Sequence, residues 1–572
     1  MRFICLLLIF IAGAVQAQTQ TQFGAIISGK DRHHPIFAAN GMVASQEARA
    51  TNEGVEVLRQ GGNAIDAAVA VGFTLAVTLP RAGNLGGGGF MVIHHAGSGE
   101  TLALDYREKA PAAAARDLFL DKAGNVDKAK ARFSHASVGV PGTVAGLLAA
   151  HQRYGKLSRE QVLAPAIRLA RKGFERDAAY VSAITSVNTY LADHPEHNEV
   201  AAAMLVIFGA QDRIVDTGQA IVLERIATRG VAGFYEGEVA EAIVNATQHH
   251  LTTQDLGNYT PRWEQPLSID IGGGNTIVAM PPPSSGGVAI GQIVGLLQRI
   301  GANELPQDSP AFAQYLVESM KHAFADRAEH MADAAFVEVP VEPLLDTEYL
   351  DTLAQSIRID RTLDRYAYGS VTPPPDDDGT SHLCVVDKDG MTVAVTETIN
   401  TSFGSLVLVE PFGFMLNNEM DDFSSPSGVN VYGLRQSDKN LPEPGKRPLS
   451  SMSPTIVAHD GVPVLVLGAS GGPRIISSVV QVLLRVLWAG DEPIEALKRP
   501  RLHHQWMPDR VYFEAEINIR TQESLQSNGH EINERGHIGV VQVIHIDDGM
   551  VKPACDPRKG GRPAGINYPA GK

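Results

Sequence analysis

The sequence predicts a mixed fold of helices and strands around large buried cores. Helical periodicity alternates with short apolar strands in the first half of the chain, and hairpins of alternating residues follow residue 380. Of the 572 residues, 44% are hydrophobic and 20% are charged. This balance is typical of globular proteins and excludes a disordered chain. The length allows several domains or one large continuous architecture.

The first predicted elements are two consecutive helices. A helical pattern runs over 45–60 and stops at Gly61-Gly62. Asn63 is an N-cap residue and Asp66 a first-turn acid, which together predict the start of a second helix over 64–76. That helix is apolar almost all round, so we expect it to be buried.

Strands follow the second helix, and the pattern continues to the C-terminal region. The segments 90–93 and 102–107 read as a hairpin with Arg107 at its end. Further helices are expected at 142–153, 287–299, 311–332 and 474–488, and further strands at 383–386, 392–398, 455–458 and 462–467.

Charge and the N-terminal residues indicate an exported protein. The formal net charge of -16 argues against nucleic acid as a partner, because phosphate binding needs clustered Lys and Arg. Residues 1–17 read as a signal peptide, with cleavage expected after Ala17. No other segment reaches transmembrane length, so we expect a periplasmic or secreted protein without a membrane span. Only Cys384 and Cys555 remain after cleavage, and we expect both to be thiols.

The Gly379-Thr380 junction is the strongest catalytic signal. It lies between the acidic run 373–378 and a predicted strand. A threonine hydroxyl is a weak nucleophile unless a base lies beside it, and cleavage before Thr380 would supply its own α-amine, with a pKa of about 8. One residue would then provide nucleophile and base. The alternative is an ordinary threonine that opens a hairpin.

Ser470 is a competing nucleophile. Gly468-Ala469-Ser470-Gly471-Gly472 fits the G-x-S-x-G elbow between a predicted strand and a predicted helix. Asp509 followed by His530 or His537 would complete the order of a triad. Against this hypothesis, the pattern occurs often by chance, and the stretch before Ser470 is far longer than such a fold needs.

Other glycine and histidine patterns point to no ligand. Gly86–Gly89 precede a strand and lack a following Lys-Ser or Lys-Thr, so they fit neither a phosphate loop nor a dinucleotide fingerprint. The histidine pairs lack metal-ligand spacing, and we expect no zinc site. These pairs are His33-His34, His94-His95, His249-His250 and His503-His504.

Taken together, the motifs resemble the γ-glutamyltranspeptidase family of N-terminal-nucleophile hydrolases over nearly the whole mature chain. Their order and spacing carry the resemblance, since no single block is decisive. The matching blocks are 52–66, 83–90, 105–108, 140–143, 281–287, 379–382, 417–423, 447–455 and 468–473.

The resemblance implies a fold and a maturation. The expected fold is a four-layer αββα sandwich built from two chains after self-cleavage between Gly379 and Thr380. Residues 18–379 would form the large subunit and residues 380–572 the small subunit of a heterodimer. Thr398 would orient the Thr380 hydroxyl, and the N–H groups of Gly471 and Gly472 would form the oxyanion hole.

The resemblance also implies a site for the donor's α-carboxylate and α-ammonium. Arg107 would bind the carboxylate, because a planar guanidinium makes bidentate contacts. Asp422 and Glu419, helped by Asn400, would hold the ammonium. Ser450 and Ser451 would hydrogen-bond the carboxylate. Without the resemblance, the acidic segment 417–423 would equally suit a solvated or calcium-binding loop.

The implied activity is cleavage of the γ-glutamyl amide of glutathione and its conjugates, with transfer to water, amino acids or peptides. No metal or organic cofactor is implied. Departures are mild: Ser381 stands where threonine is common, and Glu419 where some members have glutamine. The segment 424–434, with Tyr432, matches the lid loop of many members. Alternatives are a glutaryl or cephalosporin acylase on the same fold, and a non-catalytic binding protein.

Overall fold

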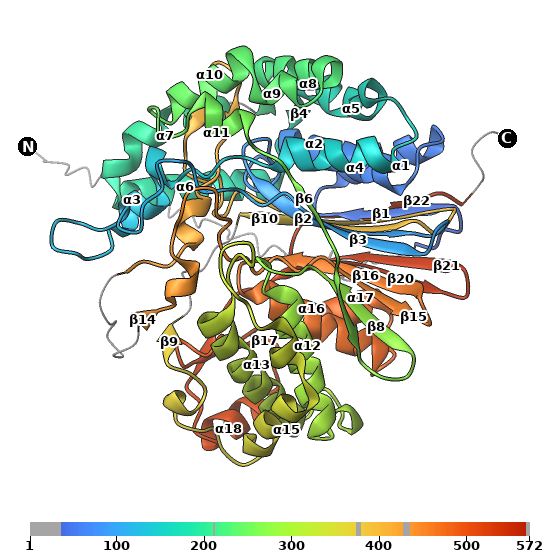
Figure 1. Cartoon of the computed structure of the whole chain (residues 1–572). Helices are drawn as coiled ribbons and strands as arrows, with labels where there is room; N and C mark the ends of the chain where they lie inside the picture. The colour runs from blue at the N-terminus through green and yellow to red at the C-terminus, as the bar shows by residue number, and fades with distance from the viewer. Residues whose placement is uncertain (1–35, 210–211, 373–378, 427–434, 568–572) are drawn as a thin grey trace, which may run out of the picture. The chain divides into compact units, whose positions relative to one another are not determined.

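The computed structural model describes residues 36–567, except 210–211, 373–378 and 427–434. The predicted signal peptide, His33-His34 and Tyr432 lie outside the described residues. Two large sheets dominate this part of the chain, and they lie face to face (Figure 1). Each sheet is covered by helices on its outer face.

The first sheet has seven strands, and every neighbouring pair is antiparallel. It contains strands from both sides of the Gly379-Thr380 junction, and β10 and β11 lie between β1 and β2. In spatial order they are β22 (Ala564–Gly565), β1 (Gly41–Ser45), β10 (Thr380–Asp387), β11 (Thr392–Thr398), β2 (Gly88–His95), β3 (Glu100–Asp105) and β6 (Arg262–Glu264).

The second sheet has six strands, also antiparallel throughout. Its central strand, β16, packs across β10 and β11 of the first sheet. In spatial order the strands are β21 (Met550–Cys555), β20 (Val540–Asp547), β16 (Val462–Ser470), β15 (Thr455–His459), β8 (Asn275–Ala279) and β7 (Leu267–Asp270).

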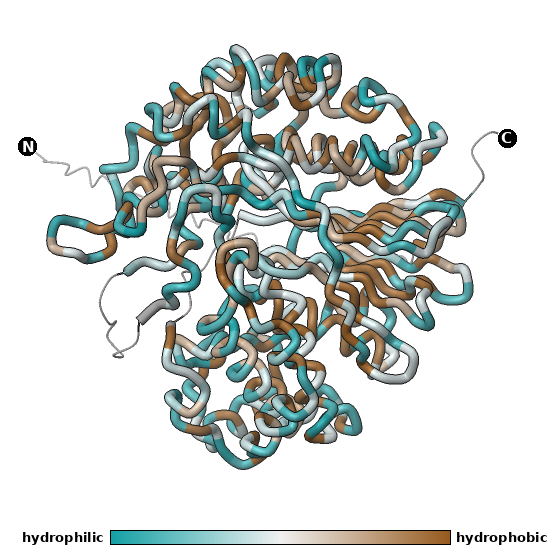
Figure 2. The backbone as a smooth tube through the Cα atoms, viewed as in Figure 1, coloured by the Kyte–Doolittle hydropathy of each residue, from teal (hydrophilic) through white to brown (hydrophobic). Residues whose placement is uncertain are grey.

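Alternation along β10 divides its side chains between two cores. Leu383 and Val385 join the core beneath α1 (Ala48–Arg59), α2 (Ala64–Thr78) and α4 (Thr143–Tyr154). Cys384 and Val386 join the core between the sheets, which extends to α12 (Gly286–Arg299), α13 (Pro310–His330) and α16 (Arg474–Leu487). The four-layer helix, sheet, sheet, helix arrangement is confirmed. Hydrophobic residues concentrate along the paired sheets, as Figure 2 shows.

The predicted secondary structure is confirmed for the named elements, with ends shifted by a few residues. Asn63 and Asp66 form a capping box at the start of α2, and every residue of α2 is buried. The hairpin predicted from the sequence corresponds to β2 and β3. Burial on all sides explains why α2 lacks a polar face.

Further elements surround this framework. Helices are α3 (Lys128–Arg132), α5 (Arg159–Lys172), α6 (Ala178–Asp193), α7 (Asn198–Phe208), α8 (Thr217–Arg229), α9 (Ala232–Tyr235), α10 (Gly237–Ala246), α11 (Thr253–Gly257), α14 (Val341–Leu345), α15 (Thr347–Ser356), α17 (Pro493–Lys498) and α18 (Ile519–Ser527). Short strands are β4 (Phe174–Glu175), β5 (Arg213–Ile214), β9 (Val371–Thr372), β12 (Leu408–Val409), β13 (Phe414–Met415), β14 (Arg435–Gln436), β17 (Leu502–His503), β18 (Val511–Phe513) and β19 (Ile532–Glu534).

The two cysteines of the described residues, Cys384 and Cys555, are free and buried, so the expectation of thiols is confirmed for them. Burial raises the pKa of the Cys384 and Cys555 thiols above the ordinary value. A reactive cysteine needs a lowered pKa and some exposure, and these two have neither. Among the helices of the described residues, none has the length and apolar character needed to cross a bilayer.

Candidate active site

Thr380 begins β10 and lies directly opposite Thr398, the last residue of β11. Both side chains are 1% exposed. The two hydroxyl oxygens are 3.0 Å apart, within hydrogen-bond distance. The antiparallel register therefore places the predicted nucleophile and its predicted orienting residue side by side.

The peptide bond before Thr380 is held by the same turn. The Gly379 N–H donates to Asn400 O at 2.5 Å, and the Ile399 N–H donates to Gly379 O at 3.2 Å. Thr398 Oγ lies 3.3 Å from Gly379 O and accepts the Asn400 N–H at 2.9 Å. A Cβ on residue 379 would lie 2.0 Å from Thr401 O, so only glycine fits here.

Negatively charged side chains surround Arg107, which lies two residues after the end of β3. Its guanidinium donates to Glu419 and to Asp422. It also donates from Nε to Pro448 O at 3.1 Å and from Nη2 to Leu449 O at 2.9 Å. The Arg107 side chain is 1% exposed. Residues predicted to bind opposite ends of a donor thus contact one another directly.

Burial and charge shift the pKa values in this cluster. Burial by itself lowers the pKa of Arg107, but the carboxylates of Glu419 and Asp422 raise it above its ordinary value. Burial raises the pKa of Asp422, and Arg107 opposes that shift. Burial likewise raises the pKa of Glu108 to about 7, again opposed by Arg107. Arg107 therefore stays charged and holds the neighbouring carboxylates by ion pairing.

Asn400 follows the Thr398 turn with a left-handed backbone at φ 70°. Its side-chain N–H donates to Asn418 O at 3.0 Å. Its Oδ1 is buried and has no hydrogen-bond partner among the described residues. A buried acceptor without a partner is costly, so this oxygen is available to a donor on a ligand or a water molecule.

Ser450 and Ser451 lie in the segment that also accepts hydrogen bonds from Arg107. Ser450 Oγ accepts the Met452 N–H at 3.1 Å. Ser451 Oγ accepts from Arg327 Nη2 at 2.9 Å. Among the described residues, neither hydroxyl makes a hydrogen bond with Arg107, although the Leu449 carbonyl beside them does.

Two residues near the site were missed by the sequence interpretation. Arg327, on α13, is 5% exposed and donates to Ser285 and Ser451. Glu108 is fully buried, and Nη1 of Arg107 lies 3.7 Å from its carboxylate. Arg327 lies in no recognisable motif, and its position in a predicted helix does not distinguish it from a surface arginine. Glu108 lies in the segment 105–108, which matches a family motif. Its position next to Arg107 was the sequence feature that could have identified it.

Gly471 and Gly472 follow β16 directly and precede α16. Their φ angles are +127° and +59°, in the region that favours glycine. In the described part of the chain, neither N–H donates to a protein acceptor. Unused N–H groups near a helix start suit an anion, as the oxyanion-hole prediction requires.

The geometry does not support Ser470 as a nucleophile. Ser470 is fully buried, and its Oγ accepts from Gln46 Nε2 at 2.6 Å. Asp509 instead contacts Lys321 at 3.1 Å, and His530 contacts Gln314 at 3.0 Å. The strand, turn and helix expected of an elbow are present, but the triad partners are engaged elsewhere.

The described residues contain no group of three or more His, Cys, Asp or Glu side chains that would suit a metal ion. His503 pairs with Ser477, and His94 with Thr101, so these rings have hydrogen-bond roles. The segment 417–423 was also considered as a calcium-binding loop. Its carboxylates Glu419 and Asp422 instead pair with the guanidinium of Arg107, which supplies the positive charge.

Comparison with known proteins finds relatives over most of the chain. The family model for gamma-glutamyltranspeptidase matches residues 50–566. The glutathione hydrolase proenzyme of Escherichia coli (strain K12) is 42% identical over 542 residues, which cover 92% of each chain. The glutathione hydrolase proenzyme of Pseudomonas aeruginosa is 38% identical over 576 residues, which cover 97% of each chain.

Solved structures show the same architecture. The cephalosporin acylase from Bacillus halodurans superposes with a TM-score of 0.82 at 26% identity, covering 94% of this chain and 98% of that chain. The γ-glutamyltranspeptidase from Pseudomonas nitroreducens complexed with L-DON gives a TM-score of 0.53 at 35% identity, covering 56% of this chain and 96% of that chain. With a family model over most of its length, this chain belongs to the γ-glutamyltranspeptidase family.

Proposed function

We propose that this protein is a self-processing γ-glutamyl hydrolase and transferase. It cleaves the γ-glutamyl amide of glutathione and its conjugates and passes the group to water, amino acids or peptides. The observation that carries the proposal is the Thr380 hydroxyl, paired with Thr398 beside the Gly379 carbonyl. Relatives named glutathione hydrolase proenzyme supply the substrate class.

Maturation begins within the continuous chain. Thr380 Oγ–H donates to Thr398 Oγ, and Thr398 Oγ–H donates to Gly379 O, an orientation that the distances allow. Thr380 Oγ attacks the Gly379 carbonyl carbon, and the negative oxygen is stabilised by Thr398 and the Ile399 N–H. The C–N bond breaks as the hydroxyl proton passes to the departing nitrogen, which frees the Thr380 α-amine and leaves an ester between Gly379 and Thr380 Oγ. Water then hydrolyses the ester, freeing the Gly379 carboxylate and the Thr380 hydroxyl.

Turnover repeats this chemistry on the donor. The freed α-amine of Thr380 accepts the hydroxyl proton while Oγ attacks the γ-carbonyl of the donor. The N–H groups of Gly471 and Gly472 stabilise the oxyanion, and the amine leaving group departs with a proton. A γ-glutamyl ester remains on Thr380. Water or an acceptor amine then attacks the ester and restores the enzyme. No metal or organic cofactor takes part.

Donor recognition uses the charges around Arg107. The α-carboxylate of the donor binds Arg107, with Ser450 and Ser451 beside it, and the α-ammonium binds Asp422 and Glu419. The unpaired Oδ1 of Asn400 accepts from the ammonium. A zwitterion can insert into the Arg107–carboxylate cluster without changing its net charge, because it supplies one charge of each sign. This balance limits the desolvation cost of binding.

The two proposed subunits, residues 18–379 and 380–572, stay together after cleavage. Strands β10 and β11 pair with β1 and β2 of the other subunit within one sheet. Separating the products would expose the unpaired strand edges and both cores. We further propose export by a signal peptide over residues 1–17, to the periplasm or outside the cell, and a lid that includes Tyr432.

A second candidate is a glutaryl or cephalosporin acylase, favoured by the TM-score of 0.82 to a cephalosporin acylase. A glutaryl donor has no α-ammonium, so Asp422 and Glu419 would have no partner on it. The presence of both Asp422 and Glu419 therefore favours a donor with an α-ammonium, which is the γ-glutamyl reaction.

The experiment measures processing and substrate choice on the same sample. Denaturing gel electrophoresis and N-terminal sequencing of each band should show a smaller fragment that begins at Thr380. The purified protein is then assayed with γ-glutamyl and glutaryl anilides. Faster release of the arylamine from the γ-glutamyl compound supports the proposal, whereas turnover of the glutaryl compound alone would establish the acylase. An intact active chain would reject Thr380 as nucleophile.

A further inference from the structure

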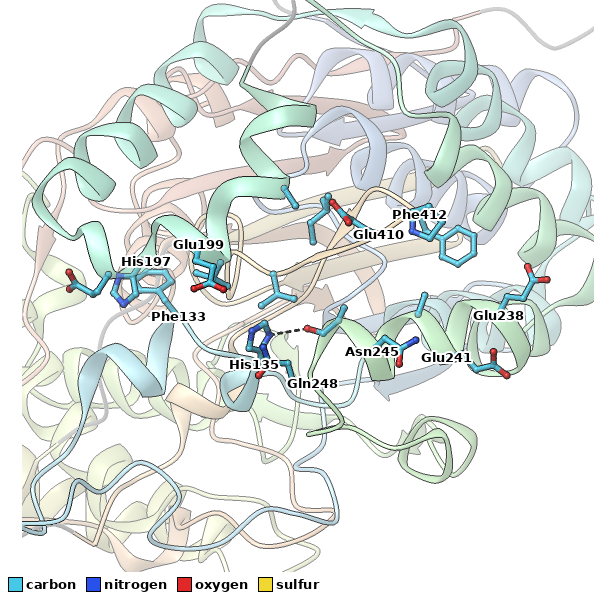
Figure 3. A pocket seen from close by; sticks show the side chains of 18 residues that line it. Phe133, His135, His197, Glu199, Glu238, Glu241, Asn245, Gln248, Glu410 and Phe412 are labelled. Carbon is cyan, nitrogen blue, oxygen red and sulfur yellow. Dashed lines mark hydrogen bonds between the residues drawn. The ribbon is translucent and has the colours of Figure 1, made fainter.

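A cavity of about 800 Å³ lies apart from the candidate active site. It is bounded by α7, α10, the segment after α3 and the loop around β12 (Figure 3). None of the residues assigned above to catalysis or donor binding lines it. Its size falls within the range of small-molecule and cofactor sites, roughly 300 to 1,000 Å³.

The cavity combines an acidic rim with an apolar floor. Glutamates reach it from several elements, including Glu199 on α7, Glu241 on α10 and Glu410 in the loop. The floor is formed by aromatic and aliphatic side chains such as Phe133 and Leu408. Among the described residues, no Lys, Arg or His makes an ion pair with Glu199, Glu241 or Glu410.

Arg225 does not line the cavity but contacts two residues that do. Its guanidinium makes an ion pair with Glu238, which lines the cavity. The same guanidinium lies 5.3 Å from the centroid of the Phe412 ring, which also lines the cavity. A carboxylate and an aromatic ring therefore bind one guanidinium at the edge of the cavity, while Glu199, Glu241 and Glu410 have no ion-pair partner among the described residues.

We propose that this cavity binds a basic peptide segment in which Arg or Lys alternates with apolar residues. Long basic side chains lay their apolar stems on hydrophobic surface and extend their charged ends to carboxylates. That division matches a floor of Phe133 and Leu408 beneath a rim of glutamates. A linear polyamine would satisfy the rim but would leave the aromatic floor largely uncovered. The peptide is therefore the occupant that fits both halves.

The test uses the full processed protein and a fluorescent synthetic peptide of alternating arginine and leucine, followed by anisotropy. The pocket variant is Glu199→Gln/Glu241→Gln/Glu410→Gln. The matched control is Glu342→Gln/Glu348→Gln/Glu523→Gln, three exposed glutamates outside the cavity that change the net charge equally. Basal γ-glutamyl activity of both variants, which alter no catalytic residue, checks folding.

We expect saturable binding that weakens about tenfold in the pocket variant and stays unchanged in the control, because each rim ion pair contributes modestly. A peptide with serine in place of leucine should also bind more weakly. Equal loss in the two variants would overturn the proposal in favour of non-specific charge attraction. Spermine binding as tightly as the peptide would overturn it in favour of a polyamine site. Absence of saturable binding would reject the site altogether.

Discussion

The Thr380 junction and the Arg107 cluster are both buried, yet they are built from opposite kinds of chemistry. Around Thr380, neutral hydroxyl, carbonyl and N–H groups form the contacts. Around Arg107, a guanidinium and carboxylates form ion pairs. Both regions use residues from either side of the cleavage point.

In the proposed mechanism, this difference separates bond making at Thr380 from donor recognition at Arg107. A neutral network needs no protonation change to orient Thr380 Oγ, so it can act before the α-amine exists. A charged cluster can select a zwitterion, because the ligand replaces the ion pairs that its entry disrupts. We therefore expect changes at Thr380 or Thr398 to affect processing, and changes in the cluster to affect donor use.

Thr380→Ala should give the largest effect, a single uncleaved chain without γ-glutamyl activity. The variant removes the only proposed nucleophile and leaves the β10 backbone in place. Gel electrophoresis and an anilide assay check both properties. Thr380→Ser is the matched control, because it keeps the hydroxyl, and we expect it to process. Two fragments from the alanine variant would contradict the assignment.

Thr398→Val should slow processing by about 100-fold, because loss of one oxyanion donor typically costs 100- to 1,000-fold in rate. Valine keeps the shape of threonine but removes the hydroxyl 3.3 Å from Gly379 O. The measurement is a time course of fragment formation from freshly made precursor. Thr398→Ser should restore most of the rate. An unchanged rate for the valine variant would remove Thr398 from the processing mechanism.

Asp422→Asn should lower kcat/KM for a γ-glutamyl anilide by about 10- to 100-fold, since hydrogen bonds to charged groups contribute roughly 1.5–3 kcal/mol. The amide keeps the side-chain shape but removes the charge that attracts the ammonium. Processing should stay normal, which separates the two regions. A parallel assay with a glutaryl anilide supplies the control, because that donor has no ammonium. Equal losses with both donors would refute ammonium binding by Asp422.

The smallest effect concerns Glu397, which neighbours Thr398 but lies near the α2 layer. Burial raises the pKa of Glu397 to about 8, a shift that a hydrogen bond from Tyr106 opposes. The folded protein therefore binds a proton that the unfolded chain releases above its ordinary pKa of 4.5. The resulting stability is fully present below that value and is lost as pH rises through about 8.

Glu397→Gln should flatten the fall in thermal midpoint between about pH 5 and pH 9, because the amide does not titrate. Some slope should remain, since the pKa of Glu108 is also raised, to about 7. Thermal unfolding of the variant and the parent protein across this range measures the effect. Identical slopes would show that Glu397 does not titrate as proposed. Activity at a single pH should change little.

Sequence patterns predicted helices and strands well where a single local feature, such as a helix cap or strand alternation, determines the element. The α2 helix was identified from its cap and apolar composition, and both features appear in the structure. The hairpin of β10 and β11 followed from alternation and the Asp389-Gly390 turn. Helices such as α8 and α10 were not named in the sequence analysis, and they pack on neighbouring helices rather than on the central sheets.

The site was only partly predictable for a different reason. Arg107 and Asp422 were identified individually, as residues expected to bind opposite ends of a donor. Their direct ion pair joins positions 315 residues apart in sequence, and no local pattern reports such a contact. Arg327 was missed because its role depends on Ser451, which folding brings to it from the other proposed subunit.

By itself, the sequence determined the mixed helix and sheet composition, the Gly379-Thr380 junction and the membership of a family whose motifs recur in order. These features depend on short-range preferences and on residue types that chemistry requires at fixed spacing. Only the tertiary structure decided that Thr398 faces Thr380, that Arg107 pairs with Glu419 and Asp422, and that Ser470 is held by Gln46. Those contacts depend on strand register and on the packing of one layer against another, which many distant residues determine jointly.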